Sequence, residues 1–479
     1  MGGKTLLAAA AALVLGAAAG ARQDGAAFEK ARAEAVAGLV GRLEELAEWC
    51  ATKKAFAARE ETYHTILRFD AEHAGAHRGL GHTKDKQGVW SEAHNRAAPA
   101  DYDKAALKEV PGRRDAAVRP FCERVHALLD EHAEALARER VLAAQDEILL
   151  LAPDDPRVRA ARGEARVEER WVLIETATAK QRRGELKDLV RAAFERTPEP
   201  TSSAPTEAER ALGPAFGDAA STPVVRVLAT GARTEAVTAA KALHAGRDFF
   251  NHGLNASADY HPAFRVFLLA LGGEKEALLA NHPALDERAR GFLRPLVAGG
   301  IEGTGDVAHW GGEEAQRLDG ASRIALGFLF TAAFGITSDH GWAYEGFGLY
   351  MTRELIGTRL TWFVQPSQYL RPADDRALRA RLLLPGTNWI NEANNVLQGD
   401  RRPKLSFVMG KTVNNLTTED LLFSYVTAAY LLEGRPKETP ELLRRVGAGT
   451  APQQAVEDVL GMNVMELDAR VRRWLTERR

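Results

Sequence analysis

The chain has 479 residues, which is enough for two or three domains. Its 63 basic and 65 acidic residues give a net charge of −2, and 45% of its residues are hydrophobic. This balance argues against nucleic acid or an anionic membrane surface as the partner, and the hydrophobic content is ordinary for a globular protein.

The N-terminus reads MGGKTLLAAAAALVLGAAAGARQDG. A positive charge at Lys4 precedes an apolar run, and Ala19 and Ala21 stand at the −3 and −1 positions of a small-residue cleavage site. We expect residues 1–21 to be a signal peptide. An uncleaved anchor is the alternative, but the run is shorter than the ~20 residues of a spanning helix. We expect a protein that is exported to the periplasm, cell surface or medium, with no membrane span after cleavage.

The chain has two cysteines, Cys50 and Cys122. Export would permit a disulfide between them. Both lie in segments with helical patterns, so two buried thiols are an equal alternative. Two cysteines cannot build a zinc site alone.

Residues 22–196 are rich in Ala, Leu, Glu and Arg and carry helical apolar spacing, as in Leu39, Leu43 and Leu46. We expect a helical domain. Two stretches within it resemble each other: LRFDAEHAGAHRGLGHTKDKQGVW, which ends at Trp90, and LLLAPDDPRVRAARGEARVEERW, which ends at Trp171. Each predicts a helix, a polar turn, a second helix, a Gly and a packing Trp. This plan resembles tetratricopeptide-like helical repeats, although the spacing is irregular.

Residues 197–222 have three prolines and a Ser/Thr cluster within their first ten residues, so we expect a linker there. Beyond it, 223–231 reads as a strand, 232–253 as a helix and 264–272 as a buried strand, followed by a helix in KEALLAN. From Arg317 onward the pattern is mainly helical. The expected class is α+β and mainly helical, with a helical repeat-like domain in front.

The order of several motifs in residues 223–479 resembles the peptidase MA-like gluzincins, which are zinc metallopeptidases. The segment GWAYEGFGLY resembles the family's glutamate-bearing helix, LLFSYVTAAYLLEG resembles a later helix, and the C-terminal helices fit as well. In GWAYEGFGLY the matching positions are Trp342, Glu345, Gly346 and Tyr350. The resemblance implies a gluzincin-like domain over 223–479, with Glu345 at the position of the third zinc ligand.

The family's HExxH motif is absent from the chain. Its helix should lie in GASRIALGFLFTAAFG, where our alignment puts Ile324, Ala325 and Phe328 at the His, Glu and His positions. Two ligands and the general base would therefore be missing, and we interpret this apolar helix as repacked core. We expect no catalytic residue, no metal ligand and no cofactor.

Without a metal, a buried carboxylate at Glu345 would be costly. We expect it to face water, to pair with Arg323 or Arg353, or to have a raised pKa. An ordinary carboxylate near a helix N-terminus is the simplest interpretation. The alternative is a former substrate cleft that still binds a ligand through Trp342, Glu345 and Tyr350.

The histidines do not indicate a standard metal site. His309 or His340 would join Glu345 only in a non-standard zinc site, and His340 lies in an apparent turn. His73 and His77 have the i, i+4 spacing of metal ligands, but they straddle a turn.

These patterns favour an exported, non-catalytic pseudo-peptidase that binds a protein or peptide or acts as a scaffold. A metal-dependent hydrolase with an unusual site around Glu345, which would need zinc, is one alternative. A purely structural protein of the cell envelope is another.

Overall fold

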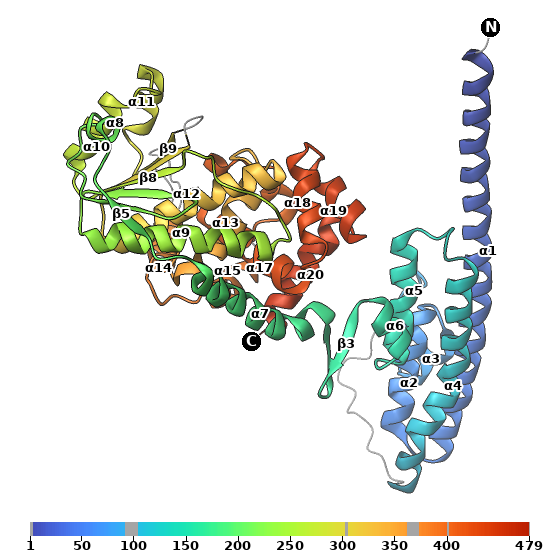
Figure 1. Ribbon diagram of the computed structural model, residues 1–479. Coiled ribbons are helices and arrows are strands. Elements are labelled where there is room, and N and C mark those ends of the chain that lie inside the picture. The colour runs from blue at the N-terminus through green and yellow to red at the C-terminus, as the bar shows by residue number, and fades with distance from the viewer. Residues whose placement is uncertain (1–2, 92–103, 302–304, 362–372, 400–401, 479) are drawn as a thin grey trace. The chain divides into compact units, whose positions relative to one another are not determined.

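The computed structural model describes residues 3–91, 104–301, 305–361, 373–399 and 402–478. It is mainly helical with a small mixed sheet, so the expected α+β, mainly helical class is confirmed (Figure 1). Its internal contacts divide the chain into two units, Met1–Gly163 and Glu164–Arg479. No helix in the described ranges is long and apolar enough to cross a membrane.

The first unit is built from helices and one short hairpin. Its elements are α1 (Gly3–Thr52), α2 (Phe56–Phe69), α3 (Ala74–Gly79), β1 (Thr83–Lys84), β2 (Trp90–Ser91), α4 (Lys104–Glu131), α5 (Arg138–Leu151) and α6 (Pro156–Ala161). Helices α1, α2 and α4 pack together over a core that includes Leu39, Leu43 and Phe121. Cys50 and Cys122 are both buried in this core and no disulfide joins them. Burial raises the pKa of the Cys122 thiol to about 11.

The two similar stretches fold in the same way, and each continues into a hairpin that the sequence did not predict. The short helices α3 and α6 are capped by His73 and Asp155, whose side chains accept from backbone N–H groups. A left-handed Gly follows each helix, Gly81 at φ 77° and Gly163 at φ 65°. The hairpins are β1–β2 and β3 (Glu164–Val167) with β4 (Arg170–Leu173).

His73 and His77 do not share a face. His73 caps α3, whereas the ring of His77 stacks on Trp90 at 4.3 Å between centroids. This contact agrees with the packing role that we expected for Trp90.

The second unit holds the sheet and most of the helices. Its strands after the β3–β4 hairpin are β5 (Thr201–Ser203), β6 (Ala219–Ser221), β7 (Arg226–Ala229), β8 (Arg265–Leu269), β9 (Ala298–Ile301) and β10 (Asp306–Trp310). Its helices are α7 (Ile174–Arg196), α8 (Glu207–Arg210), α9 (Arg233–Gly253), α10 (Gly272–Asn281), α11 (Glu287–Leu293), α12 (Glu314–Phe334), α13 (Gly341–Ile356), α14 (Ala373–Leu382), α15 (Trp389–Leu397), α16 (Leu405–Val408), the 3₁₀ turn η2 (Val413–Asn415), α17 (Thr418–Gly434), α18 (Thr439–Gly447), α19 (Pro452–Leu460) and α20 (Val464–Glu477).

The sheet has the strand order β5-β6-β7-β8-β10-β9. Strands β7, β8 and β10 run parallel, with Val227 opposite Val266 and Val266 opposite Val307. Strand β9 pairs antiparallel with β10 and lies at the edge of the sheet. The side chains alternate between two cores. Val266 and Val307 join the core with α9 and α12, while Phe267 and Ala308 face the core with α10 and α11.

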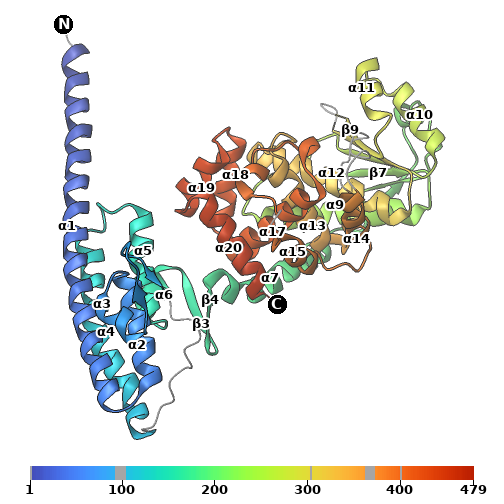
Figure 2. The same cartoon turned by 180° about the vertical axis from the view of Figure 1, so that it is seen from behind.

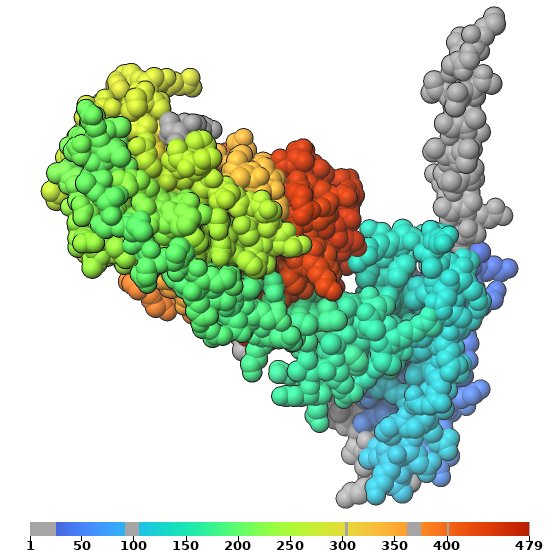
Figure 3. Space-filling view, viewed as in Figure 1, coloured from blue at the N-terminus to red at the C-terminus, as the bar shows by residue number. Residues whose placement is uncertain are grey.

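The C-terminal helices surround one buried helix. Figure 2 shows α13, α15 and α20 around α17, whose residues from Leu421 to Leu432 are all buried. Helix α18 packs on α12. In the space-filling view, α18 and α19, in red, and the β6–α9 region, in green, are visible on one face of this unit (Figure 3).

Residues 197–222, expected as a linker, carry β5, α8 and β6 of the sheet. Helix α7, expected to end the first domain, lies in the second unit because its buried Glu175 is held there. The Glu175 carboxylate accepts from Tyr430 Oη at 2.9 Å, Arg435 Nε at 2.8 Å and Arg470 Nη2 at 3.0 Å. These partners lie 255 to 295 residues further along the chain, so the local pattern gives no sign of the ion pair.

Helix α13, the GWAYEGFGLYM segment, contacts its neighbours through three glycines. A Cβ atom at Gly341 would lie 2.6 Å from the carbonyl oxygen of Lys411. At Gly346 it would overlap the backbone of Ser424 in α17, and at Gly348 it would overlap the guanidinium of Arg323 in α12. Small residues at these positions allow α13 to lie close to three elements at once.

We expect Gly346→Ala to destabilise the protein by about 1–3 kcal/mol or more, because the new methyl group overlaps the rigid backbone of α17. The matched control is Gly184→Ala in the exposed part of α7, where no atom lies within 4 Å of the added Cβ. That change should stabilise the protein by up to about 1 kcal/mol. Urea unfolding of both variants checks this, and equal stabilities would contradict the packing of α13 on α17.

Candidate functional site

Helices α12 and α13 are joined by a buried ion pair. Arg323 of α12 and Glu345 of α13 are 0% and 2% exposed, and Nη2 of Arg323 lies 3.1 Å from Oε2 of Glu345. Arg323 Nη2 also donates to the carbonyl oxygen of Tyr344 at 2.8 Å, and the guanidinium lies over the Tyr344 ring. Of the three expected outcomes for Glu345, the structure shows pairing with Arg323.

The face of α12 turned to α13 differs from our alignment by one residue. Arg323 and Gly327, four residues apart, face α13, and a side chain at Gly327 would overlap the Tyr344 hydroxyl. Ile324 and Phe328 lie against Gly300 of β9 instead. A Cβ atom added at Gly300 would be 3.4 Å from each of these two side chains. Residues 323 and 327 are therefore the positions of α12 that face α13, and 324 and 328 face β9.

The residues at this point do not fit a zinc ion. Zinc needs three protein donors in a catalytic site. On the face of α12 turned to α13, Arg323 supplies a positive charge and Gly327 supplies no side chain, so neither is a zinc donor. Because a guanidinium cannot lose its proton, Arg323 repels a cation under all ordinary conditions. Removing one partner of such a buried pair strongly destabilises the folded protein, because the other charge is left buried without compensation.

Trp342 and Tyr350, the other expected binding residues, are buried in the core at 0% and 2% exposure. Trp342 packs edge-on against Phe347, with 6.2 Å between the ring centroids. Tyr350 donates from its hydroxyl to Oε1 of Glu433 at 2.9 Å. The structure therefore brings neither of them to Glu345 in an open cleft, and both act in packing.

Glu433 of α17 is the centre of a second buried cluster. Besides the Tyr350 hydroxyl, its carboxylate contacts Nη2 of Arg478 at 2.9 Å and Nε of Arg183 in α7 at 3.4 Å. Burial raises the pKa of Glu433 to about 7, and the two arginines limit that rise. Burial also raises the pKa of Tyr350 well above its usual value, so Tyr350 stays protonated and can donate. The cluster joins α7, α13 and α17.

His309 and His340 do not meet Glu345 in a shared site. His340 precedes α13, and its Nδ1 accepts from the backbone N–H of Thr337 at 3.1 Å. His309 is buried at 3% exposure on β10 and lies against Gly320 of α12. In the described ranges, no group of three or more His, Cys, Asp or Glu side chains is placed to hold a metal.

A hollow of about 200 Å³ lies beside the edge strand β9. Gly299 and Gly300 of β9, Phe292 of α11 and Tyr344 of α13 are among the residues that line it. Phe292 is 59% exposed. Sequence reasoning missed Tyr344, although it is the residue of GWAYEGFGLY that reaches this hollow. No local signal marks Tyr344, because the side chain of α13 that reaches the hollow depends on the tertiary packing of that helix.

No protein-family model, no curated protein and no solved structure matches this chain.

We expect Glu433→Gln to change the pH dependence of stability. The carboxyl has a folded pKa of about 7 against an ordinary value of 4.5, so the folded state holds its proton more tightly. Its contribution to stability is therefore fully present below about pH 4.5 and is lost as pH rises through about 7, a change of up to about 3 kcal/mol. Unfolding of wild type and variant at several pH values gives the difference, which should fall as pH rises.

Glu457→Gln, on the exposed side of α19, is the control and should leave the pH profile of wild type unchanged. A wild-type advantage over Glu433→Gln that grows with pH would mean that the arginines keep Glu433 ionised throughout.

Proposed function

We propose that the protein is an exported, non-catalytic relative of gluzincin peptidases that binds an extended peptide segment of a partner protein. The observation that carries this proposal is the buried pair of Arg323 and Glu345, which stands where the resemblance places a zinc ion. A site with this charge cannot activate a water molecule through zinc. The helical N-terminal unit would supply further surface for the partner.

The hollow beside β9 supports the binding part of the proposal. An edge strand offers backbone N–H and C=O groups to an added strand, and peptides bind to many proteins in this way. The apolar lining of the hollow, with the exposed Phe292, would receive a side chain of the bound peptide.

Selection of random peptides displayed on phage against residues 22–479 tests the proposal. We expect enriched peptides that bind the wild-type protein and are not cut when zinc is supplied. Phe292→Ser should weaken their binding at least about tenfold, because it removes an apolar wall of the hollow. Phe407→Ser is the matched control, since Phe407 is 69% exposed in the same unit and does not line the hollow.

The alternatives give different results in the same experiment. Cleavage of the selected peptides, with zinc bound in stoichiometric amount, would favour the hydrolase with an unusual site. Failure to enrich any peptide on a folded, metal-free protein would favour the purely structural role.

A second experiment tests the resemblance itself. We expect Arg323→His with Gly327→His to bind zinc together with Glu345, because these positions lie four residues apart on the face of α12 turned to α13. Tyr344→Ala is added to make room for the side chain at 327. The control carries Ile324→His, Phe328→His and Tyr344→Ala and should bind no zinc. Metal analysis of the two folded proteins decides, and equal zinc contents would contradict the proposed ancestry of the site.

A further inference from the structure

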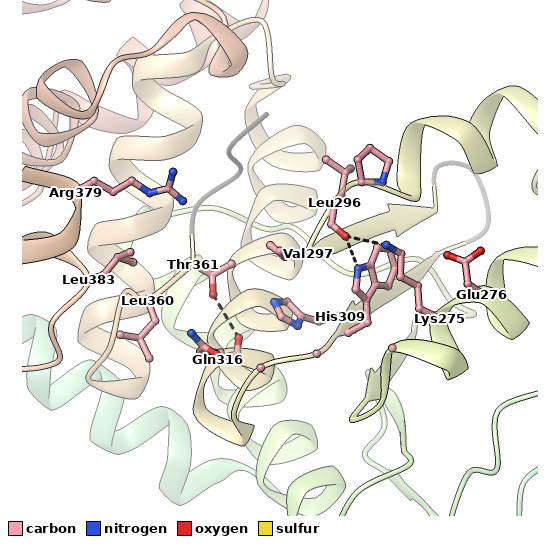
Figure 4. A pocket seen from close by; sticks show the side chains of 15 residues that line it. Lys275, Glu276, Leu296, Val297, His309, Gln316, Leu360, Thr361, Arg379 and Leu383 are labelled. Carbon is pink, nitrogen blue, oxygen red and sulfur yellow. Dashed lines mark hydrogen bonds between the residues drawn. The ribbon is translucent and has the colours of Figure 1, made fainter. Parts of the chain in front are cut away.

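The loop that follows α13 lines two cavities of the second unit. The larger, of about 580 Å³, lies beyond the carboxyl ends of β8 and β10, and Figure 4 shows Leu360 and Thr361 at its wall. The smaller, of about 150 Å³, is lined by Leu360, by Arg353 in the last turn of α13, and by residues 384–387 between α14 and α15. Arg359 of the loop also lines the smaller cavity. Two arginines therefore line one small cavity.

The buried carboxylate of Asp319 in α12 holds this loop in place. It accepts a hydrogen bond from the hydroxyl of Thr358 at 2.9 Å. It also accepts from the backbone N–H of Leu360 at 3.0 Å and of Thr361 at 2.8 Å. Arg359 lies among these three residues in the sequence, so the same hydrogen bonds fix the backbone from which its side chain extends.

The guanidinium of Arg359 is held in place but keeps one N–H group free. Its Cζ lies 4.7 Å from the centre of the Trp389 ring and 5.1 Å from that of the Tyr425 ring, and its Nη2 donates to the carbonyl oxygen of Thr387 at 2.7 Å. Arg359 is 8% exposed, and its Nε is fully covered. Its Nη1 is not fully covered and makes no hydrogen bond in the described part of the chain. Nη1 is therefore the atom that a ligand in the cavity can contact.

The charge of the two arginines is not neutralised by a direct ion pair. Arg353 is exposed, and within the described ranges neither arginine pairs with a carboxylate. Glu354 and Asp319 act on Arg359 only from a longer distance, and burial raises the pKa of Asp319, which limits its negative charge. Burial lowers the pKa of Arg359, and the positive charge of Arg353 adds to this effect. Both guanidinium groups nevertheless stay protonated at ordinary pH, so an anion in the cavity would supply the missing opposite charge.

The size of the cavity selects a small anion. A water molecule takes about 30 Å³ of the liquid, so the cavity has room for a group of about five heavy atoms, which is the size of a phosphate. Guanidinium groups bind phosphate oxygens through strong, charge-assisted hydrogen bonds.

We propose that this cavity binds a phosphate group between Arg353 and Arg359, either as the free ion or as the head of a small phosphate ester. Nη1 of Arg359 donates from the floor of the cavity, and the exposed Arg353 closes on the anion from the surface. This site is independent of the peptide-binding function proposed above, because its lining shares no residue with the hollow beside β9.

Titration calorimetry of residues 22–479 with inorganic phosphate, phenyl phosphate and acetate at constant ionic strength tests the proposal. We expect at least one phosphate compound to bind at least about tenfold more tightly than acetate, since a phosphate dianion can accept from both arginines. Arg353→Gln should weaken this binding at least about tenfold, because it removes one of the two charges. The matched control is Arg376→Gln, which is exposed on α14, does not line the cavity and should leave binding unchanged.

A pair of glycines tests the cavity by adding a negative charge. Gly386 lines the cavity, and a Cβ atom added there has open space around it. Gly386→Glu should therefore place a carboxylate beside the arginines and abolish phosphate binding. Gly184→Glu adds the same charge on the exposed part of α7, which does not line the cavity, and should bind phosphate as the wild type does.

The two phosphate compounds distinguish the sources of the ligand. Binding of inorganic phosphate alone would identify the free ion, whereas phenyl phosphate that binds equally well or better would identify an ester. Failure of the folded wild type to bind either compound, acetate that binds as tightly as both, or equal binding by Arg353→Gln and Arg376→Gln would each overturn the proposal.

Discussion

The close approach of α13 to its neighbours is the constraint on which the second unit depends. Gly341, Gly346 and Gly348 leave no room for a side chain, so α13 lies directly against the loop before η2, against α17 and against Arg323 of α12. This contact fixes the orientation of the helix. Tyr344 then reaches the hollow beside β9, Glu345 meets Arg323, and Tyr350 points to Glu433. Packing of this kind tolerates almost no added volume.

The same packing explains why a positive charge is stable between α12 and α13. Arg323 is fully buried, which is costly unless the charge is compensated. Glu345 supplies the opposite charge, the Tyr344 carbonyl accepts one hydrogen bond, and the Tyr344 ring lies against the guanidinium. A metal ion in a peptidase site fills a comparable electrostatic role for a buried glutamate. The pair thus places a carboxylate of the core beside an opposite charge.

Local patterns predicted the secondary structure well and the site poorly. The periodicity over 232–253 matches α9, and the apolar run over 264–272 contains β8, because burial on one or both faces leaves a direct mark on composition. The strands β9 and β10 were missed, since their segment is rich in Gly and reads as a loop. The pairing of Arg323 with Glu345 was one of the expected outcomes. For Trp342 and Tyr350 the sequence left both packing and ligand binding open, because aromatic residues serve equally in cores and in clefts, and the structure buries both. His309 looked unimportant because its place on a buried strand beside a cavity depends on the tertiary fold.

The contacts of Glu175 limit where recombination in evolution could join this part of the chain to a different N-terminal region. Helix α7 follows the helical region in sequence, yet Tyr430, Arg435 and Arg470 near the C-terminus hold its carboxylate. A recombination event that joined a new N-terminal region after residue 196 would leave two arginines facing a vacant core position. A junction at Gly163 and Glu164 would carry both halves of this contact together. The unit of inheritance for the sheet-bearing part therefore begins well before its sheet.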